Sequence, residues 1–337
     1  MSVLRQIRAA IQNRILGETI LPEEFATGIA DPQQEISVML DGMGEAIDVT
    51  FHHSTACSDP FLIAVAFEGR TPTSRELCRL SLKFYERDGE RKLLGDIGLR
   101  LSETISVMGS ELFLFAPCSV CNYCLPRLFL GAHYSLHLFR QWESLSTSGM
   151  TMTFLQRRAA MVSFIRPHPT VLISIKDEFG GNMFPMNVMG ALGDGRFGFA
   201  LRNDRLAGQS VERAGRLVMS NVPVRHASLT YGMAGNHTKA FVRWDELPFL
   251  TKPSPMFRIP IPEFALRVRE MELEKVHKIG SHNFFVARIL RDTVSSSEPS
   301  LCVIHGYYQE WRLRGDAAKM KASLLEDRLN KHGDQTH

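Results

Sequence analysis

The sequence predicts a mainly β protein built in two parts, and three observations lead to this prediction. Short runs in which apolar and polar residues alternate recur along most of the chain, which is the pattern of half-buried strands. The chain has 337 residues, which is long for a single hydrophobic core. Residues 143–149 form a polar stretch of mostly small residues, so we place the boundary between the two parts there.

The composition excludes several classes of protein. Hydrophobic residues make up 44% of the chain and charged residues 22%, as in ordinary globular proteins. The formal net charge is only +3 and the basic residues are scattered, so we expect no nucleic-acid partner. No apolar run reaches the roughly 18 residues that a membrane span needs, so we expect no membrane segment. Six cysteines without an export signal predict a cytoplasmic protein with reduced thiols.

The first part, residues 1–145, is predicted to be an antiparallel β-rich domain, and its role is unknown. An amphipathic helix is expected over Met1–Leu16, and Asp88-Gly89 is a strong signal for a tight hairpin turn. Alternation predicts strands at residues 36–40, 47–51 and 78–84, and a nearly continuous apolar run predicts one at 61–67. Further strands are predicted at residues 91–95, 112–115 and 134–139.

Three cysteines in this part, Cys118, Cys121 and Cys124, follow one another at intervals of three residues. Such spacing allows thiolates to converge on one zinc ion or iron–sulfur cluster. A fourth ligand is missing nearby, and the flanking sequence is that of a hydrophobic core, where cysteine packs as a small apolar side chain. We therefore favour packing over a metal site, with redox-active thiols as a third alternative.

The second part, residues 150–315, is predicted to combine strands with short helices, and residues 316–337 to form a terminal helix and tail. Gly193-Asp194-Gly195 is expected to be a hairpin turn, and Asp204 to cap a short helix that ends at Ala214. Strands are predicted at residues 170–175, 197–201, 217–222, 264–276, 282–289 and 301–308.

Four segments of this part, in this order, resemble the flavin reductase-like branch of the FMN-binding split-barrel superfamily over residues 155–313. The first is a proline-led strand, the second an Asn-Met-Phe-Pro-Met-Asn segment, the third a strand, helix and strand, and the fourth a Gly-Ser-His turn that runs into a strand. They lie at residues 166–174, 182–187, 199–223 and 280–289.

The resemblance implies a small split β-barrel that forms a homodimer, with FMN or FAD in a groove near the subunit interface and NAD(P)H as co-substrate. It assigns donors for the flavin ring to Asn182, Met186 and Asn187. The flavin phosphate would bind where a strand ends and a helix begins, a place that favours anions. The residues implied for this phosphate are Arg202, Asn203 and Ser210.

The resemblance implies a catalytic role for His282, which would orient the nicotinamide against the flavin, because the flavin itself accepts the hydride. The alternative for a histidine in a turn is a hydrogen bond to a nearby carbonyl. Tyr307 and Tyr308 are expected in the last strand, where at most one of them faces the site, since neighbouring strand residues face opposite sides.

The sequence also departs from the family pattern. Ser281 and Ala287 stand where the family has Asp and Gly, and Pro185, Met186 and Asn187 replace a Thr-Ser pair. We therefore carry alternative functions forward. The leading one is an NAD(P)H-dependent flavin reductase, with a monooxygenase as its partner. The others are a non-catalytic FMN-binding or sensing protein and an interaction protein on a degenerate barrel.

Overall fold

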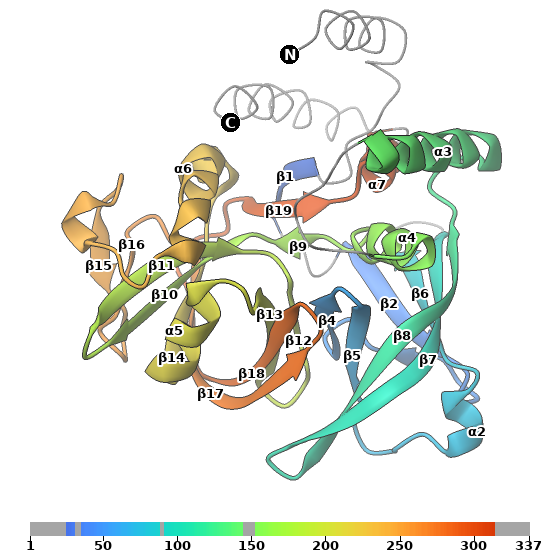
Figure 1. Cartoon of the computed structure of the whole chain (residues 1–337), viewed down its shortest axis with the longest axis horizontal. Coiled ribbons are helices and arrows are strands. Elements are labelled where there is room, and N and C mark those ends of the chain that lie inside the picture. The colour runs from blue at the N-terminus through green and yellow to red at the C-terminus, as the bar shows by residue number, and fades with distance from the viewer. Residues whose placement is uncertain (1–24, 31–34, 88–90, 144–151, 314–337) are drawn as a thin grey trace, which may run out of the picture.

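The computed structural model describes residues 25–30, 35–87, 91–143 and 152–313 (Figure 1). The helices expected at the two ends of the chain, the Asp88-Gly89 turn and most of the 143–149 boundary lie outside these residues. The strands are β1 Phe25–Ile29, β2 Ile36–Asp41, β3 Ile47–Asp48, β4 His53–Ser58, β5 Phe61–Ala66, β6 Ser81–Glu86, β7 Leu93–Val107, β8 Ser110–Asn122, β9 His168–Pro169, β10 Val171–Asp177, β11 Gly180–Met186, β12 Met189–Ala191, β13 Arg196–Arg202, β14 Arg216–Asn221, β15 Thr251–Pro253, β16 Pro260–Pro262, β17 Arg267–Ile279, β18 His282–Val294 and β19 Ser300–Ile304. The helices are α2 Ser74–Leu77, α3 Arg127–Glu143, α4 Phe154–Ser163, α5 Leu206–Ala214, η1 Val224–His226, α6 Ala227–Gly232, η2 Ala234–Thr238, η3 Trp244–Glu246 and α7 Gly306–Leu313.

Two seven-stranded antiparallel sheets dominate the molecule, which confirms the predicted mainly β fold. The first sheet has the order β3-β2-β6-β7-β8-β5-β4, and the second has the order β11-β10-β14-β17-β18-β13-β12. Apolar residues line the inner face of each sheet, because alternate side chains of a strand point to the same face. The second sheet curls around its own core, as Figure 1 shows, and this is the part for which a split barrel was predicted.

The two sheets have the same topology. The seven strands of the first sheet, β2 to β8, can be matched one by one, in chain order, with the seven of the second, which are β10, β11, β12, β13, β14, β17 and β18. With this matching, the two sheets have the same order of neighbouring strands. A short helix precedes the fifth strand of the first set, α2 before β6, and α5 precedes β14 at the matching place. The chain is therefore an internal pair of equivalent folding units, which sequence reasoning did not detect.

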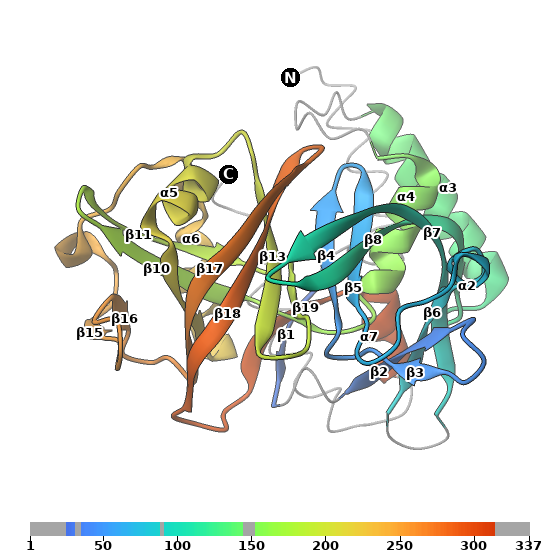
Figure 2. The ribbon, with the colours of Figure 1, turned by 90° about the horizontal axis from the view of Figure 1, so that it is seen from below.

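The outer faces of matching strands pack against each other at the junction of the two sheets (Figure 2). Leu62 and Leu114 of the first sheet share one buried cluster with Ala200, Phe284 and Val286 of the second. This explains why β5, β13 and the first half of β18 are buried on both faces, since one face covers the sheet's own core and the other covers the junction. The junction is therefore a third core of the molecule, and it joins the two units.

The strands at the junction also approach closely at the backbone level. Ser54 on β4 donates its hydroxyl to the carbonyl of Gly198 on β13 at 3.1 Å. A side chain at Gly190 would clash with the His53 carbonyl, so β12 lies directly on β4. Glycine is needed at Gly190 for this contact.

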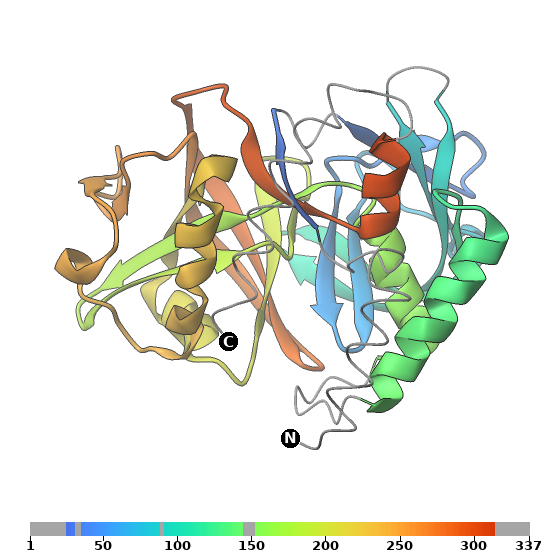
Figure 3. The ribbon, with the colours of Figure 1, turned by 90° about the horizontal axis from the view of Figure 1, so that it is seen from above.

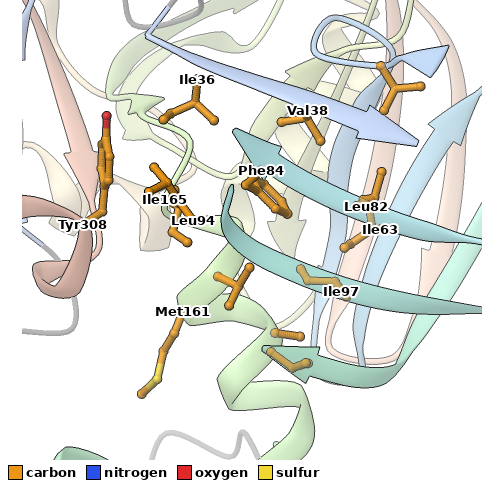
Figure 4. Packing of buried hydrophobic residues seen from close by; sticks show 14 of the residues in the cluster. Ile36, Val38, Ile63, Leu82, Phe84, Leu94, Ile97, Met161, Ile165 and Tyr308 are labelled. Carbon is orange, nitrogen blue, oxygen red and sulfur yellow. The ribbon is translucent and has the colours of Figure 1, made fainter. Parts of the chain in front are cut away.

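The core of the first sheet is completed by helices from distant parts of the chain (Figures 3 and 4). Met161 and Ile165, in and just after α4, pack among Ile36, Leu94 and neighbouring residues, and Tyr308 from α7 joins the same cluster. Helix α4 follows the expected boundary in sequence, yet it packs with the first sheet. A three-stranded sheet, β1-β19-β9, connects the start of each unit with the end of the chain.

Three local predictions were wrong. Residues 134–139 belong to helix α3 and not to a strand, because both neighbours of β8 in the sheet are already taken and Pro126 favours the start of a helix. Tyr307 and Tyr308 lie in helix α7, where neighbouring residues can face the same core, and both are buried in the first unit. Asp204 does not cap α5, since the cap residue is Arg205 and Asp204 binds Arg202.

No helix among the described residues is long and apolar enough to cross a membrane.

Candidate functional site

The residues that were predicted to contact the flavin ring lie on or just after β11, the edge strand of the second sheet. Asn182 is completely buried, and its amide nitrogen donates to the carbonyls of Asn236 at 3.1 Å and Lys239 at 2.8 Å. Met186 packs in the core of the second sheet. Asn187 is half-buried, and its carbonyl faces Nδ1 of His168 at 3.3 Å. These side chains and this carbonyl are therefore engaged within the protein itself.

The outer edge of β11 is sealed by the following part of the same chain. The carbonyls of Gly181, Met183 and Pro185 alternate along this edge and point away from β10. They accept hydrogen bonds from the Val242 backbone N–H at 2.8 Å, from the Asn236 amide at 2.8 Å and from Nε2 of His237 at 2.7 Å, respectively. A flavin ring cannot reach these carbonyls while this segment is in place.

The residues that were predicted for the phosphate lie around the start of α5. Arg202, at the end of β13, holds Asp204 with two hydrogen bonds of 2.9 Å and 2.6 Å. Asn203 donates its amide to the carbonyl of Gly280 at 2.8 Å. Ser210 is buried inside α5, one helical turn away from the exposed start.

The start of α5 has the properties of an anion site. Its cap residue, Arg205, makes no side-chain cap bond, and the first turn contains no acidic residue. The first N–H groups of a helix have no partner within the helix, and they carry a partial positive charge. With Arg202 and Arg205 beside it, this end of the helix fits a phosphate group, although Asp204 neutralises part of the charge.

His282 lies opposite Arg202 in the pairing of β13 with β18 and is only 5% exposed. The Ser281 hydroxyl is 2.7 Å from its Nδ1, and the Cys57 sulfur lies 3.8 Å from the same atom. Burial, followed by the positive charge of Arg202, lowers the pKa of His282 to about 4. His282 is therefore neutral near pH 7, with its Nδ1 hydrogen-bonded inside the protein.

The turn before His282 is also a contact between the two units. The N–H of Ser281 donates to the carbonyl of Asp59 at 2.8 Å, in the turn between β4 and β5. Gly280 has a positive φ of 49°, and a side chain there would clash with this carbonyl and with Pro60. The structure thus brings together Arg202, Asn203 and His282 at the junction, while Asn182 and Met186 lie elsewhere in the second unit.

A second buried polar cluster at the junction was missed by sequence reasoning. Arg166 is 3% exposed, its nearest polar partner is Nε2 of His53 at 3.3 Å, and its Nε has no partner among the described residues. Burial lowers the pKa of Arg166 to about 10, and burial with the charge of Arg166 lowers the pKa of His168 to about 4. The only signal in the sequence was the charged residue before the Pro-His-Pro segment.

The three cysteines do not gather around a metal. Cys118 and Cys121 are exposed on β8, whereas Cys124 is buried with its thiol toward the carbonyl of Leu94. Within the described residues no group of three or more metal-binding side chains is found. The metal site, which was not favoured, has no support in this part of the chain.

Comparisons with known proteins give similarity of fold over part of the chain. No family model matches, and no curated protein matches. One similar solved structure is the FMN-binding protein from Thermus thermophilus with bound 1-cyclohex-2-enone, with 24% identity over 38% of this chain and 71% of that chain and a TM-score of 0.34. A second is the Streptomyces globisporus C-1027 NADH:FAD oxidoreductase, with 12% identity over 44% of this chain and 89% of that one and a TM-score of 0.38.

A third similar structure is the styrene monooxygenase flavin reductase from Pseudomonas putida S12. It has 15% identity over 44% of this chain and 92% of that one, with a TM-score of 0.36. Each of these likenesses spans less than half of the present chain.

Proposed function

We propose that this protein is a flavin-binding oxidoreductase of the NAD(P)H-dependent flavin reductase type, in which one chain supplies both barrels of the pair. The observation that carries the proposal is the meeting of Arg202, Asn203 and His282 at the junction of two units with the same topology. The sequence resemblance implies a flavin groove near the interface between two such barrels, and here the interface lies within one chain.

The residues fit one end of a flavin better than the other. The uncapped start of α5, with Arg202 and Arg205 beside it, suits the phosphate. The predicted ring ligands on β11 do not fit, because they are buried and the edge carbonyls are already bonded. The proposal therefore keeps Arg202 and Asn203 as phosphate ligands and assigns no ring contact to Asn182 or Met186.

A bound flavin would supply the chemistry of hydride acceptance from the nicotinamide. The role we assign to His282 is orientation, since a neutral imidazole fixed by Ser281 keeps one conformation and carries no charge to repel or attract the cofactor. A monooxygenase would then consume the reduced flavin, as the name of the styrene monooxygenase flavin reductase indicates for that protein.

A second candidate function, an interaction protein on a degenerate barrel, is favoured by the sealed edge of β11. The three outward-pointing carbonyls of β11 accept hydrogen bonds from residues 236–242 of the same chain, and this closes the predicted ring site. A protein of this kind has no need for a flavin.

The absorption spectrum of the purified protein separates the two candidates. A flavin bound with sub-micromolar affinity stays with the protein and absorbs near ~450 nm, so a yellow protein is expected. NADH or NADPH oxidation with added FMN is then expected at roughly one turnover per second or faster. A colourless protein that binds no added FMN in a titration would eliminate the reductase and leave the interaction protein. A yellow protein without turnover would indicate the non-catalytic flavin-binding alternative.

A further inference from the structure

A surface hollow of about 520 Å³ lies at the end of the first sheet, away from the junction. It is enclosed by the last residues of β8, the start of α3 and a side chain of α4, and these two helices lie side by side in Figures 1 and 3. The lining residues are Cys121, Asn122, Tyr123, Leu125, Pro126, Arg127, Leu130, Gly131, Tyr134 and Arg158.

Three residues that line this hollow each carry a buried polar atom without a hydrogen-bond partner among the described residues. Asn122 is 7% exposed, and its carbonyl oxygen accepts from the Cys124 N–H at 2.9 Å, but its amide nitrogen has no partner. Arg158 uses one terminal nitrogen for the Val120 carbonyl at 2.7 Å, while its Nε has none. The Tyr134 hydroxyl is likewise buried and makes no hydrogen bond of good geometry among the described residues. The Arg158 guanidinium lies 5.0 Å from the centre of the Tyr134 ring.

These unpartnered atoms are all able to donate a hydrogen bond. Buried donors are almost always paired, so several unpaired donors around one hollow indicate a missing acceptor. Two contacts restrain these donors, because Asn122 is held by Cys124 and the Arg158 guanidinium packs against the rings of Tyr134 and Phe154. The donors are therefore fixed in place before any ligand binds.

The charged residues that line the hollow are both basic, and the neighbouring strand β7 places Asp96 opposite Cys121. Arg127 and Arg158 line it, and the described lining includes no carboxylate. Helix α3 begins here at Arg127 with no acidic residue in its first turn, and the start of a helix favours an anion. The remaining wall is apolar, from Leu125, Pro126 and Leu130.

We propose that this hollow binds an organic anion, a carboxylate carried on an apolar chain or ring. The carboxylate accepts from Asn122, Arg158 and Tyr134, and the apolar body lies on Leu125 and Leu130. Fixed donors with an adjoining apolar wall are the usual composition of a small-molecule site, and a carboxylate supplies the acceptors that a planar guanidinium binds best. This site is independent of the flavin proposed above, which belongs to the second unit.

The two exposed thiols of β8 provide a direct test, because Cys121 lines the hollow and Cys118 does not. The full-length protein is alkylated with iodoacetamide, and the rate at each cysteine is followed by peptide mass spectrometry with and without octanoate. We expect saturating octanoate to slow alkylation of Cys121 at least threefold and to leave Cys118 unchanged. Equal rates at Cys121 with and without octanoate, or equal slowing of both thiols, would overturn the proposal.

The chemistry of the ligand is tested with 1-octanol and inorganic phosphate in the same assay. Octanol has the apolar chain without the charge, and phosphate has the charge without the chain, so both are expected to protect Cys121 far less than octanoate does. Protection by octanol equal to that by octanoate would show an apolar crevice and reject the anion site. Protection of Cys121 by phosphate equal to that by octanoate would show that the apolar part of the ligand does not contribute to binding.

Variants connect the binding to the unpaired donors. Asn122→Asp keeps the oxygen that accepts from Cys124 but replaces the free donor with a negative charge, and it should raise the octanoate Kd at least tenfold. Tyr134→Phe keeps the ring on Arg158 and loses only the hydroxyl, so we expect about a fivefold rise, as for one hydrogen bond. Arg75→Gln, on exposed α2, removes one positive charge elsewhere and should leave the Kd unchanged. Wild-type affinity in both Asn122→Asp and Tyr134→Phe would refute the assignment.

Discussion

The two units of this chain share one topology but differ at the places where a ligand would bind. The hairpin turn of the first unit ends at Ser110, which is exposed, whereas the matching turn of the second ends at His282, which is buried against the first unit. The helix of the first unit, α2, has four residues, and α5 of the second has nine. The same strand order thus carries the longer helix and the buried hairpin histidine in one unit only.

The edge strands differ as strongly. Strand β3 of the first unit has two exposed residues, while β11 of the second has seven, of which most are buried under the 234–242 segment. The comparison teaches that topology alone does not make a site. Both units contribute polar residues to the junction, with His53 and Ser54 from the first and His282 from the second.

The largest effect on the contact between the two units is expected from removing the aromatic side chain of Phe284 in the junction cluster. Phe284 is completely buried in the junction cluster, so Phe284→Ala should lower the free energy of unfolding by about 3–5 kcal/mol through lost burial and a cavity. Urea titration of the purified protein measures this. The control is Val294→Ala at the exposed end of the same strand, which should cost less than about 0.5 kcal/mol. A Phe284→Ala protein as stable as the control would mean that the junction does not hold the units together.

The difference between His282 and Ser110 predicts a pH dependence that belongs to the second unit. Since the folded pKa of His282 is lowered to about 4 from the ordinary value of 6.5, the unfolded chain takes up a proton first as the pH falls. The stability from neutral His282 is present above pH 6.5 and is lost progressively between pH 6.5 and 4, by roughly 2 kcal/mol from pH 7 to 5.

Chemical unfolding of His282→Gln at the two pH values checks this. The variant should show a smaller decrease in stability from pH 7 to 5 than the wild type, by roughly 2 kcal/mol. The buried His53 and His168, whose pKa values are also lowered, retain their own pH dependence in the variant and serve as the internal reference. An unchanged decrease would place the pH sensitivity outside the hairpin turn.

A variant that removes one hydrogen bond at the outer edge of β11 tests how much the covering segment stabilises this edge strand. Asn236→Ala removes the amide that bonds the Met183 carbonyl and leaves that acceptor unpaired, which should cost about 1–3 kcal/mol. Thr238→Ala, at an exposed position of the same segment, should cost well under about 1 kcal/mol. Thermal unfolding measures both variants. If FMN affinity rises in Asn236→Ala, the ring site lies along β11 after all.

The smallest expected effect on stability, and a specific effect on binding, belongs to Arg202. Its ion pair with Asp204 is at the surface, so Arg202→Ala should change stability by less than about 1 kcal/mol. FMN should bind more weakly in this variant, and the difference from wild type should shrink at high salt, because salt screens exposed charges. Arg216→Ala, which removes an exposed arginine paired with Glu272, is the control. Equal FMN dissociation constants in fluorescence titrations of wild type and Arg202→Ala would exclude Arg202 from the phosphate site.

The sequence by itself determined the local structure of both units. Runs of apolar residues, alternating or continuous, located β2, β5, β10, β13 and β14, and the Gly193-Asp194-Gly195 turn was expected where β12 meets β13. Local patterns report whether a segment has one apolar face, and they do not report which other segment covers it. Residues 134–139 alternate like a strand and are nevertheless helical, and the preceding strand β8 already has a partner on each side.

Only the tertiary structure decided what the polar residues do. Asn182 and Ser210 resemble ligands in the sequence but are buried in the fold, and Arg166 and Asn122 gave no strong signal although each has an unpaired buried atom. The equivalence of the two units was also invisible, since strand order is a property of long-range pairing and not of the composition of any strand. Whether a side chain is free to bind depends on what the rest of the chain places against it, and that information is absent from the neighbouring residues in the sequence.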